Sequence, residues 1–403
     1  IGALLQLNAV QDQDAFLSGK NDDTSRFNFI KQVYKLYHNF ALEETNILPN
    51  ETVDFGKIIS IDIKPLGDFL FKTHFTFSLP PLTPESGTWA GWTNSIGHSM
   101  IEWHSLEING NEICRDYGLF MEIWYELTNP QTTRNNQLIG KYIHTRSLQS
   151  NALSNTEYRV PLNFWFNKNI GAALPLVSLY SSKVRIIIQL NSFDNCIIYD
   201  GNTPPKKVTI SEVSLTAQYI FVDDNLRNQM RDTLHTYIIE QVQASAPIYI
   251  GNTNLIKTRL DFNHPVKELF FILREIESEQ NNDWFNFGVR NTSIGTRIEH
   301  LLQEAKLEIE GKDRTVYKNA VSLSLLNNSV YHSNTPDKHI YTMQFCSDPE
   351  KWIPTGSLNF SSSTDISLSL KLTPGYSSHL HVFVKNYNWV VITDGFASLA
   401  YKS

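Results

Sequence analysis

Two histidines separated by a single residue are the most suggestive chemical feature of this sequence. His379 and His381 flank Leu380 in an apolar run, and side chains two residues apart on a strand project from the same face. Two imidazoles on one face could contribute to a metal site, but the nearby sequence offers no third ligand. We therefore expect structural or solvent-exposed histidines here, with no metal and no cofactor.

Other ionisable residues that occur in pairs have simpler explanations than chemistry. Four further histidines lack the spacing of metal ligands. They are His98, His104, His332 and His339. Asp22-Asp23 fits a polar loop, and Asp223 or Asp224 could cap a helix by accepting from free backbone N–H groups. We predict no metal-binding or cofactor-binding residues among them.

No sequence motif for catalysis is visible. The chain has no phosphate-binding loop, Gly-rich dinucleotide turn or nucleophile elbow. Glu275, Glu277 and Glu279 alternate at the end of a predicted strand, as on a solvated edge that resists wrong pairing. Gly356 is explained by a tight backbone corner that needs a residue without a Cβ atom. We therefore predict no catalytic residues and a protein that is not an enzyme.

The composition excludes several other roles. The 403 residues carry a net charge of −7, and the longest basic run is Lys206-Lys207. Because phosphate neutralisation needs a basic stripe, we expect no direct binding of nucleic acid. The three scattered cysteines argue against a disulfide framework and favour folding in a reducing compartment. No apolar run reaches the roughly 18 residues that span a bilayer, and no secretory signal is visible.

The elements that would position these residues are mostly strands. Short alternating segments between turn residues recur in both halves, which is typical of sandwiches and barrels. Asn109-Gly110 is a strong two-residue hairpin signal, and Glu310-Gly311 follows a similar strand about half a chain later. We also predict a strand over 119–127 and a long polar loop over 131–155. Residues 27–41 predict a short helix, although Phe29 and the Tyr-rich sequence also suit a strand.

One clear helix is predicted near the middle of the chain, from about Asp223 to Gln243. Six apolar residues recur there at three- and four-residue steps: Leu226, Met230, Leu234, Tyr237, Ile238 and Val242. A chain of 403 residues is long for one core, so we expect two domains joined by this helix. The predicted division is an N-terminal arm over 1–26, a first domain over 27–222, the linker helix over 223–243 and a second domain over 244–403. Leu234→Asp would then bury an unpaired charge and abolish assembly.

Thirteen short motifs, in order along almost the whole chain, resemble those of one protein family. They are Gly2-Ala3-Leu4-Leu5-Gln6-Leu7, Gln13-Asp14, Leu17-Ser18-Gly19, His38-Asn39-Phe40-Ala41, Tyr117-Gly118 with Ile123 to Thr128, Val160-Pro161-Leu162, Phe164-Trp165-Phe166, Ala173 to Leu176, Ile239 to Gln243, Asn263 to Leu269, Thr355 to Ser361, Asn386-Tyr387-Asn388 and Leu399-Ala400-Tyr401. The set is similar to that of the double jelly-roll major capsid proteins of the nucleocytoplasmic large DNA viruses. Family members often carry an Arg soon after the Asn-Phe-Ser run, where this chain has Ser362-Ser363-Thr364.

The resemblance implies an all-β fold of two tandem eight-stranded jelly rolls joined by a short helix. It also implies a structural protein of the virion, assembled in the host cytoplasm, whose homotrimers are pseudo-hexagonal capsomers that tile an icosahedral shell. Neighbouring capsomers and minor capsid proteins would be its partners, and the N-terminal arm would point toward an inner membrane.

Other interpretations of the same sequence remain open at this point. The chain could be a minor capsid paralogue with a specialised position in the shell. It could instead be a glycan-processing amidase on paired jelly rolls, which would need a polar cleft at the seam and a carboxylate of raised pKa. A carbohydrate-binding module is a third alternative, in which aromatic side chains would line an exposed platform.

Overall fold

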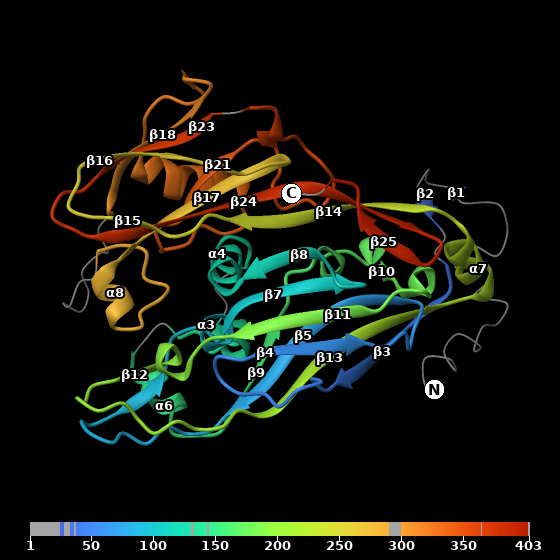
Figure 1. Cartoon of the computed structure of the whole chain (residues 1–403), viewed down its shortest axis with the longest axis horizontal. Coiled ribbons are helices and arrows are strands. Elements are labelled where there is room, and N and C mark those ends of the chain that lie inside the picture. Colours follow the sequence, from blue (N-terminus) through green and yellow to red (C-terminus); the bar gives the residue numbers. More distant parts are fainter. Residues whose placement is uncertain are drawn as a thin grey trace.

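Two antiparallel sheets from the N-terminal half pack face to face as a first jelly roll (Figure 1). The structure is a computed structural model, and it describes residues 25–27, 33–35, 38–129, 133–142, 145–289, 300–363 and 365–401. In one sheet β13 (Ser211–Val222) lies between β3 (Phe40–Ile47) and β5 (Phe69–Leu79), and β5 also pairs with β9 (Thr156–Pro161) and β10 (Leu174–Pro175). The facing sheet has the order β4 (Ile58–Ile63), β11 (Val184–Leu190), β7 (Ile101–Ile108) and β8 (Asn111–Tyr117).

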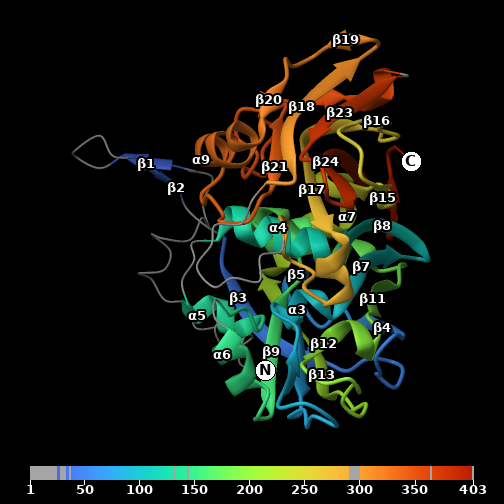
Figure 2. The ribbon, with the colours of Figure 1, turned by 90° about the vertical axis from the view of Figure 1, so that its left-hand side faces the viewer.

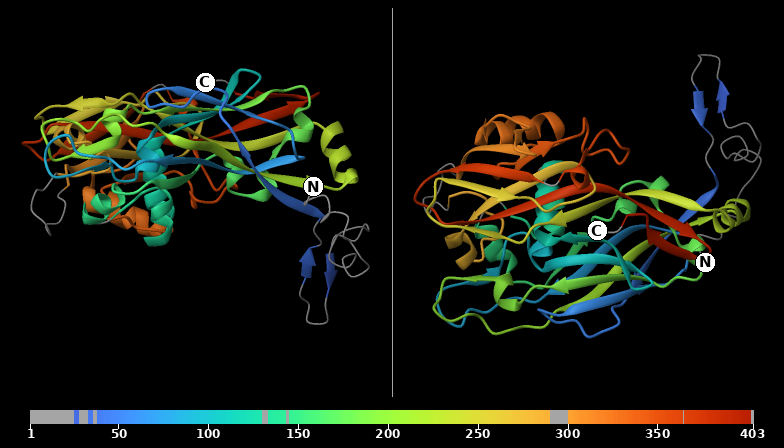
Figure 3. Two further views of the ribbon diagram at one scale, coloured as in Figure 1. Left: turned by 90° about the horizontal axis from the view of Figure 1, so that it is seen from below. Right: turned by 45° about the horizontal axis from the view of Figure 1, so that its top comes forward.

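The C-terminal half forms a second jelly roll beside the first (Figures 1 and 3). One sheet has the order β14 (His235–Ala244), β24 (Ser378–Thr393), β17 (Pro265–Glu275) and β21 (Tyr341–Gln344). Three short strands extend it, namely β15 (Ile248–Ile250), β22 (Leu358–Asn359) and β25 (Phe396–Leu399). The facing sheet has β16 (Leu255–Arg259), β23 (Ile366–Leu372) and β18 (Leu302–Ile309), and β18 also pairs with β19 (Lys312–Asp313) and β20 (Lys318–Asn319).

Short helices and strands connect these sheets. The helices are α3 (Ile96–Ser99), α4 (Gly118–Thr128), α5 (Thr133–Leu138), α6 (Thr145–Asn151), η1 (Trp165–Asn167), η2 (Ile170–Ala172), η3 (Leu176–Leu179), η4 (Phe193–Cys196), α7 (Asp224–Asp232), α8 (Ile276–Gln280), η5 (Ser322–Leu326, a π-helix), α9 (Asn327–Tyr331) and η6 (Phe360–Ser362). The remaining strands are β1 (Ser25–Phe27), β2 (Val33–Lys35), β6 (Ala90–Trp92) and β12 (Ile197–Tyr199). Within the described ranges, no helix has both the length and the apolar character needed to cross a membrane.

The two jelly rolls share one topology, strand for strand. Strands β3, β4, β5, β7, β8, β9, β11 and β13 correspond to β14, β16, β17, β18, β19, β21, β23 and β24. Both predicted hairpins are confirmed, with φ of 53° and 78° at Asn109 and Gly110 and of 49° and 70° at Glu310 and Gly311. Two successive residues with positive φ give the hairpin a twist that matches its strands. The all-β prediction of two tandem jelly rolls is therefore correct.

Each jelly roll encloses its own apolar core. In β11, Val184, Ile186, Ile188 and Leu190 are buried while the residues between them are partly exposed, as expected for a strand with one face inward. Leu368 and Leu370 of β23 occupy the corresponding positions in the second core. Burial of each such side chain contributes about 1.5–3 kcal/mol.

The predicted helix over 223–243 is wrong beyond its first half. Helix α7 ends at Asp232, and β14 then pairs over its whole length with β24. The apolar spacing that predicted a helix also suits a strand, and the β-branched residues Ile238, Ile239 and Val242 favour extended backbone. The first strand of the second jelly roll thus lies inside the predicted linker. Leu234 is 66% exposed, so it does not lie on a packed helix face.

The predicted strand over 119–127 is also wrong, because this segment is helix α4. A helix that is buried on several sides loses the polar face by which amphipathic helices are recognised. Gly118 at its first turn is required by close approach: a Cβ atom there would lie 1.9 Å from the carbonyl oxygen of Ile101. The helix can therefore begin where it does only with glycine at this position.

Three smaller predictions also need correction. In the segment over 27–41, the last residue of β1, all of β2 and the first two residues of β3 are strand, so the predicted helix is wrong where the chain is described. The loop over 131–155 contains α5 and α6. Glu277 and Glu279 lie on α8 and not on a strand edge, because the backbone turns into a helix directly after β17. Of the predicted arm over 1–26, residues 1–24 lie outside the described ranges.

Candidate functional site: the seam between the two jelly rolls

Helix α4 of the first jelly roll lies against the outer face of the second one (Figures 1 and 2). The Phe120 ring lies 5.2 Å from the Phe270 ring of β17 and 5.5 Å from the Phe383 ring of β24, measured between centroids. Ile272 belongs to the same buried cluster. Aromatic pairs of this kind contribute about 0.5–1.5 kcal/mol beyond their buried area. This part of the seam is therefore packed like a protein core.

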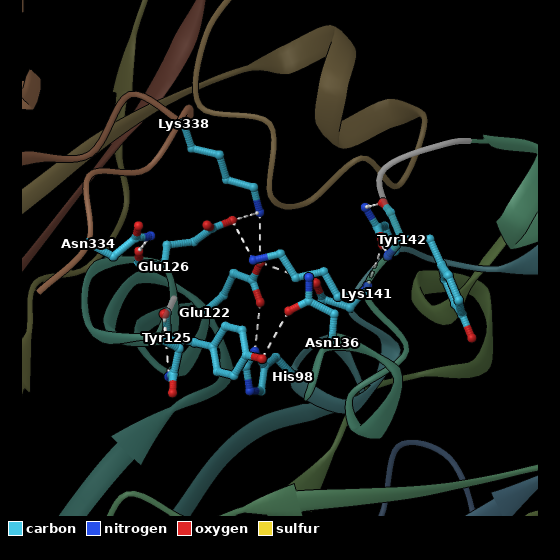
Figure 4. Close-up of polar contacts among 12 residues, drawn as sticks. His98, Glu122, Tyr125, Glu126, Asn136, Lys141, Tyr142, Asn334 and Lys338 are labelled. Atoms are coloured by element: carbon cyan, nitrogen blue, oxygen red, sulfur yellow. Dashed lines mark hydrogen bonds and ion pairs between the residues drawn. The ribbon is translucent and has the colours of Figure 1, made fainter. Parts of the chain in front are cut away.

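A carboxylate with no solvent exposure lies at the centre of this seam (Figure 4). Glu122 of α4 accepts from the Lys338 ammonium of the second jelly roll at 2.7 Å and from Ser95 Oγ at 3.1 Å. Lys141 Nζ lies 3.4 Å from that same oxygen, and the other carboxylate oxygen lies 2.7 Å from His98 Nδ1. Burial would raise the pKa of Glu122, but the two ammonium groups lower that pKa well below its usual range. The group is therefore a buried anion held by cations from both domains.

The next turn of α4 adds a second carboxylate to the same network. Glu126 lies 2.7 Å from Lys141 Nζ and 2.8 Å from Lys338 Nζ. Asn334 of the second jelly roll donates its side-chain amide to the Glu126 carbonyl oxygen at 2.7 Å, and its backbone N–H to the Leu127 carbonyl oxygen at 2.9 Å. These donors satisfy carbonyls at the end of α4 that lack partners within the helix. The second domain thus caps a helix of the first.

A second charged cluster lies against the Trp124 ring. Glu240 of β14 pairs with Lys168 of the first jelly roll at 2.6 Å, with Lys385 at 2.9 Å and with Lys267. Burial opposes ionisation of Glu240, but the three ammonium groups lower its pKa far below normal. The Lys385 ammonium also lies 3.5 Å from the centre of the Trp124 ring, a cation–π contact.

One of the histidines noted in the sequence completes the seam. His332 Nε2 lies 2.8 Å from Glu268 Oε1, and its ring stands edge-on to Trp124 with centroids 6.1 Å apart. Burial lowers the pKa of His332, but the adjacent Glu268 and Glu350 carboxylates outweigh burial and raise the pKa to about 9. The ring is therefore a cation at neutral pH, and this part of the seam is a charge-compensated structural network.

The other flagged residues are placed elsewhere. His379 Nδ1 lies 2.9 Å from Glu279 Oε2, and His381 Nε2 lies 4.0 Å from the other oxygen of that carboxylate. Burial raises the pKa of Glu279, but His381 and Arg274 lower it to about 2. In the part of the chain that the structure describes, no group of three or more metal-ligand side chains is close enough to hold an ion.

The remaining histidines and aspartates noted in the sequence have structural roles where the chain is described. His104 is buried beneath Phe164, and desolvation lowers its pKa to about 3. His339 stacks on His300 with centroids 3.7 Å apart. Asp223 caps α7, as predicted, by accepting from the Leu226 N–H at 2.9 Å. Asp22-Asp23 lies outside the described residues.

Comparison with known proteins identifies the family. A family model for the N-terminus of the major capsid protein matches residues 28–223, and one for the large eukaryotic DNA virus major capsid protein matches residues 227–398. The chain belongs to the major capsid protein family of large DNA viruses. The seam described above is formed by residues of both matched regions, so it joins the two parts of the chain that the models describe.

Individual relatives agree with this assignment. The chain is 25% identical to the major capsid protein of Phaeocystis pouchetii virus over 100% of both chains. It is 26% identical to that of Paramecium bursaria Chlorella virus 1 over 99% of both. A chain of the PBCV-1 virus capsid has the same fold, with a TM-score of 0.80 at 22% identity, over 93% of this chain and 100% of that one. These relatives are structural capsid proteins, and both matching models describe capsid proteins rather than an enzyme.

The sequence did not reveal the seam of this capsid protein. The predicted strand over 119–127 includes Glu122 and Glu126, and their cationic partner Lys338 is more than 200 residues away. The one available signal was two carboxylates four residues apart within an apolar run, which on a helix share one face.

Proposed function

We propose that the chain forms homotrimers, each a pseudo-hexagonal capsomer, and that these capsomers tile an icosahedral shell. The observation that supports this proposal is the pair of topologically equivalent jelly rolls fixed by the α4 seam. Because the seam is buried and charge-compensated, one chain is a rigid block of two similar units. Three such blocks around an axis would present six similar sandwiches, an outline that packs on a flat hexagonal lattice.

The proposed partners follow from the same arrangement. Neighbouring capsomers would contact the outer faces of the trimer, and minor capsid proteins would bind beneath it. The N-terminal arm over 1–26 would point toward an inner membrane. The three cysteines are free and buried, which suits assembly in the reducing host cytoplasm before incorporation into the virion.

A glycan-processing enzyme is disfavoured by the surroundings of Asp116. Such an enzyme would need a polar cleft with a carboxylate of raised pKa. Asp116 does have a pKa raised by burial to about 7. However, the cavity beside it measures about 20 Å³, room for about one water molecule and no substrate.

The solution mass of the purified chain tests the proposal. Light scattering should give three times the 46.2 kDa of one chain. Negative-stain images should show hexagonal outlines. A chain that stays monomeric at every concentration would refute the homotrimer.

A further inference from the structure

The loop that follows α8 reaches from the second jelly roll to the first (Figure 1). Trp284 of this loop donates its indole N–H to the Asn195 carbonyl oxygen of η4 at 2.7 Å. Asn282 donates its side-chain amide to the carbonyl oxygens of Asp194 and Ile197 at 2.6 and 2.8 Å. The loop and η4 therefore form one fixed wall to which both domains contribute.

This wall borders a cleft of about 370 Å³ between the two jelly rolls. Apolar side chains from both domains line the cleft, and most of them are aromatic: Tyr117, Leu119, Trp284, Phe285 and Phe383. Clefts of this size with mostly apolar walls and a few polar groups are typical of sites for small organic ligands. Because aromatic walls pack best against flat rings, they favour a ligand with a flat apolar body.

Arg274 of β17 supplies the cationic group of the cleft. Its guanidinium group donates from Nε to Glu279 at 2.8 Å and from Nη1 to the Trp284 carbonyl oxygen at 3.3 Å. Nη2 donates to no group of the described chain. Its two N–H groups are therefore available to a ligand in the cleft, and a guanidinium group binds carboxylates with good geometry.

The carboxylate that compensates Arg274 is shared with two histidines. Glu279 also lies 2.9 Å from His379 and 4.0 Å from His381, which lines the cleft. Burial lowers the pKa of Arg274 more than the Glu279 carboxylate raises it, so the guanidinium charge is incompletely compensated. Among the described residues that line the cleft, Glu102 is the one carboxylate, and it is exposed to solvent. A ligand carboxylate would supply the missing anion.

Two hydroxyl groups beside the cleft also lack an acceptor. Ser99 of α3 and Ser245 after β14 both line the cleft, and neither Oγ atom has a hydrogen-bond partner in the ranges that the structure describes. Unsatisfied buried polar groups are few in native proteins and need an explanation. Since one hydroxyl comes from each domain, an acceptor bound here would contact both jelly rolls.

We propose that this cleft binds a small organic carboxylate with a flat aromatic body. The carboxylate pairs with Arg274, and the aromatic body packs between Tyr117 of the first jelly roll and Trp284 of the second. A ligand that binds only the folded chain stabilises it, and the gain rises with ligand concentration. Because the whole cleft lies within one chain, the inference does not depend on the proposed homotrimer.

Thermal melts and isothermal titration calorimetry with 2-naphthoate test the ligand class. We expect the melting temperature to rise with 2-naphthoate concentration and the titration to give one site per chain. The uncharged analogue 2-naphthalenemethanol should bind about tenfold more weakly or worse, because it cannot form the ion pair with Arg274. Equal affinity for the two compounds would overturn the carboxylate, and no binding of 2-naphthoate at about 1 mM would overturn the site.

Substitutions test the location. Ser245→Phe fills the cleft and should abolish binding of 2-naphthoate, whereas Ser214→Phe is the matched control, because Ser214 is also half-buried but lies on β13 away from the cleft. Arg274→Lys keeps a cation beside Glu279 but removes the Nη2 donors, so it should weaken binding about tenfold. Circular dichroism without ligand establishes that each variant is folded. Wild-type affinity in both Ser245→Phe and Arg274→Lys, or an equal loss in Ser214→Phe, would overturn the proposed cleft.

Discussion

Lys338 Nζ of the second jelly roll lies 2.7 Å from Glu122 Oε1 of the first; the Glu122 side chain is fully buried and that of Lys338 is 19% exposed. The same ammonium also reaches Glu126 at 2.8 Å. An ion pair gains strength in a low-dielectric interior, but its charges are costly there if either partner is lost. The two domains are therefore coupled, because separating them would leave the Glu122 and Glu126 carboxylates without the Lys338 ammonium.

Lys338→Met should reveal this coupling. The substitution leaves two buried carboxylates with one cation fewer, so we expect the free energy of unfolding to fall by about 3–5 kcal/mol. Urea titration followed by tryptophan fluorescence measures the change. Adding Glu122→Gln to the same chain should recover part of the loss, because it removes one stranded charge.

The control for that experiment is Lys206→Met. Lys206 is 86% exposed and lies 3.3 Å from Glu85, and such surface pairs contribute about 0–1 kcal/mol. Equal losses at Lys338 and Lys206 would contradict the role assigned to the seam.

The stability of the chain should fall as the pH rises above neutrality. The pKa of His332 is raised to about 9 in the folded chain, against an ordinary value of 6.5. A raised pKa means that the folded state holds the proton more tightly, so its stabilising effect is complete below 6.5 and disappears as the pH rises through about 9. Linkage puts the effect on the order of 3 kcal/mol.

Denaturant titrations between pH 6 and pH 9.5 would measure this loss. The slope of unfolding free energy against pH over that window should be reduced in His332→Gln. A variant with the wild-type slope would show that another group is responsible.

Gly118→Ala should be far more damaging than an ordinary glycine substitution. The new Cβ atom would lie 1.9 Å from the Ile101 carbonyl oxygen and 2.3 Å from that of His98, and both are backbone atoms that cannot turn aside. We expect a loss of about 3 kcal/mol or more in unfolding free energy. At Gly171 the nearest atom would be the Asn169 side-chain oxygen at 3.3 Å, so Gly171→Ala should be nearly neutral. Thermal melts of the two variants and the wild-type chain would measure the difference.

The sequence predicts the fold class because its signals are local. Asn109-Gly110 and Glu310-Gly311 specify their hairpins through residues that tolerate positive φ, and no distant contact is needed. Alternation in β11 likewise reports one buried face. Such signals suffice to predict paired all-β domains.

The seam could not be predicted in the same way. Apolar residues surround most of the circumference of helix α4, so its sequence lacks the polar face that marks an amphipathic helix. These residues are buried only because the second jelly roll covers them. The pairing of Glu122 with Lys338 depends on how two complete domains meet. Periodicity within α4 carries no information about a partner in the other half of the chain.

The segment after α7 gives the sharpest test of strand against helix. In a helix over 223–243, Leu234 would lie on the packed face and a charge there would abolish assembly. In the structure Leu234 is 66% exposed, whereas Ile239 is 1% exposed on β14, where it pairs with Asn388 of β24. Leu234→Asp should change stability by no more than about 0.5 kcal/mol and leave the oligomeric mass unchanged. Ile239→Asp should strongly destabilise the chain, because it buries an unpaired carboxylate in the apolar cluster where β14 and β24 pack with the first jelly roll. Circular dichroism and light scattering on the two variants would distinguish these outcomes. A larger loss of stability in Leu234→Asp than in Ile239→Asp would favour the helix over 223–243.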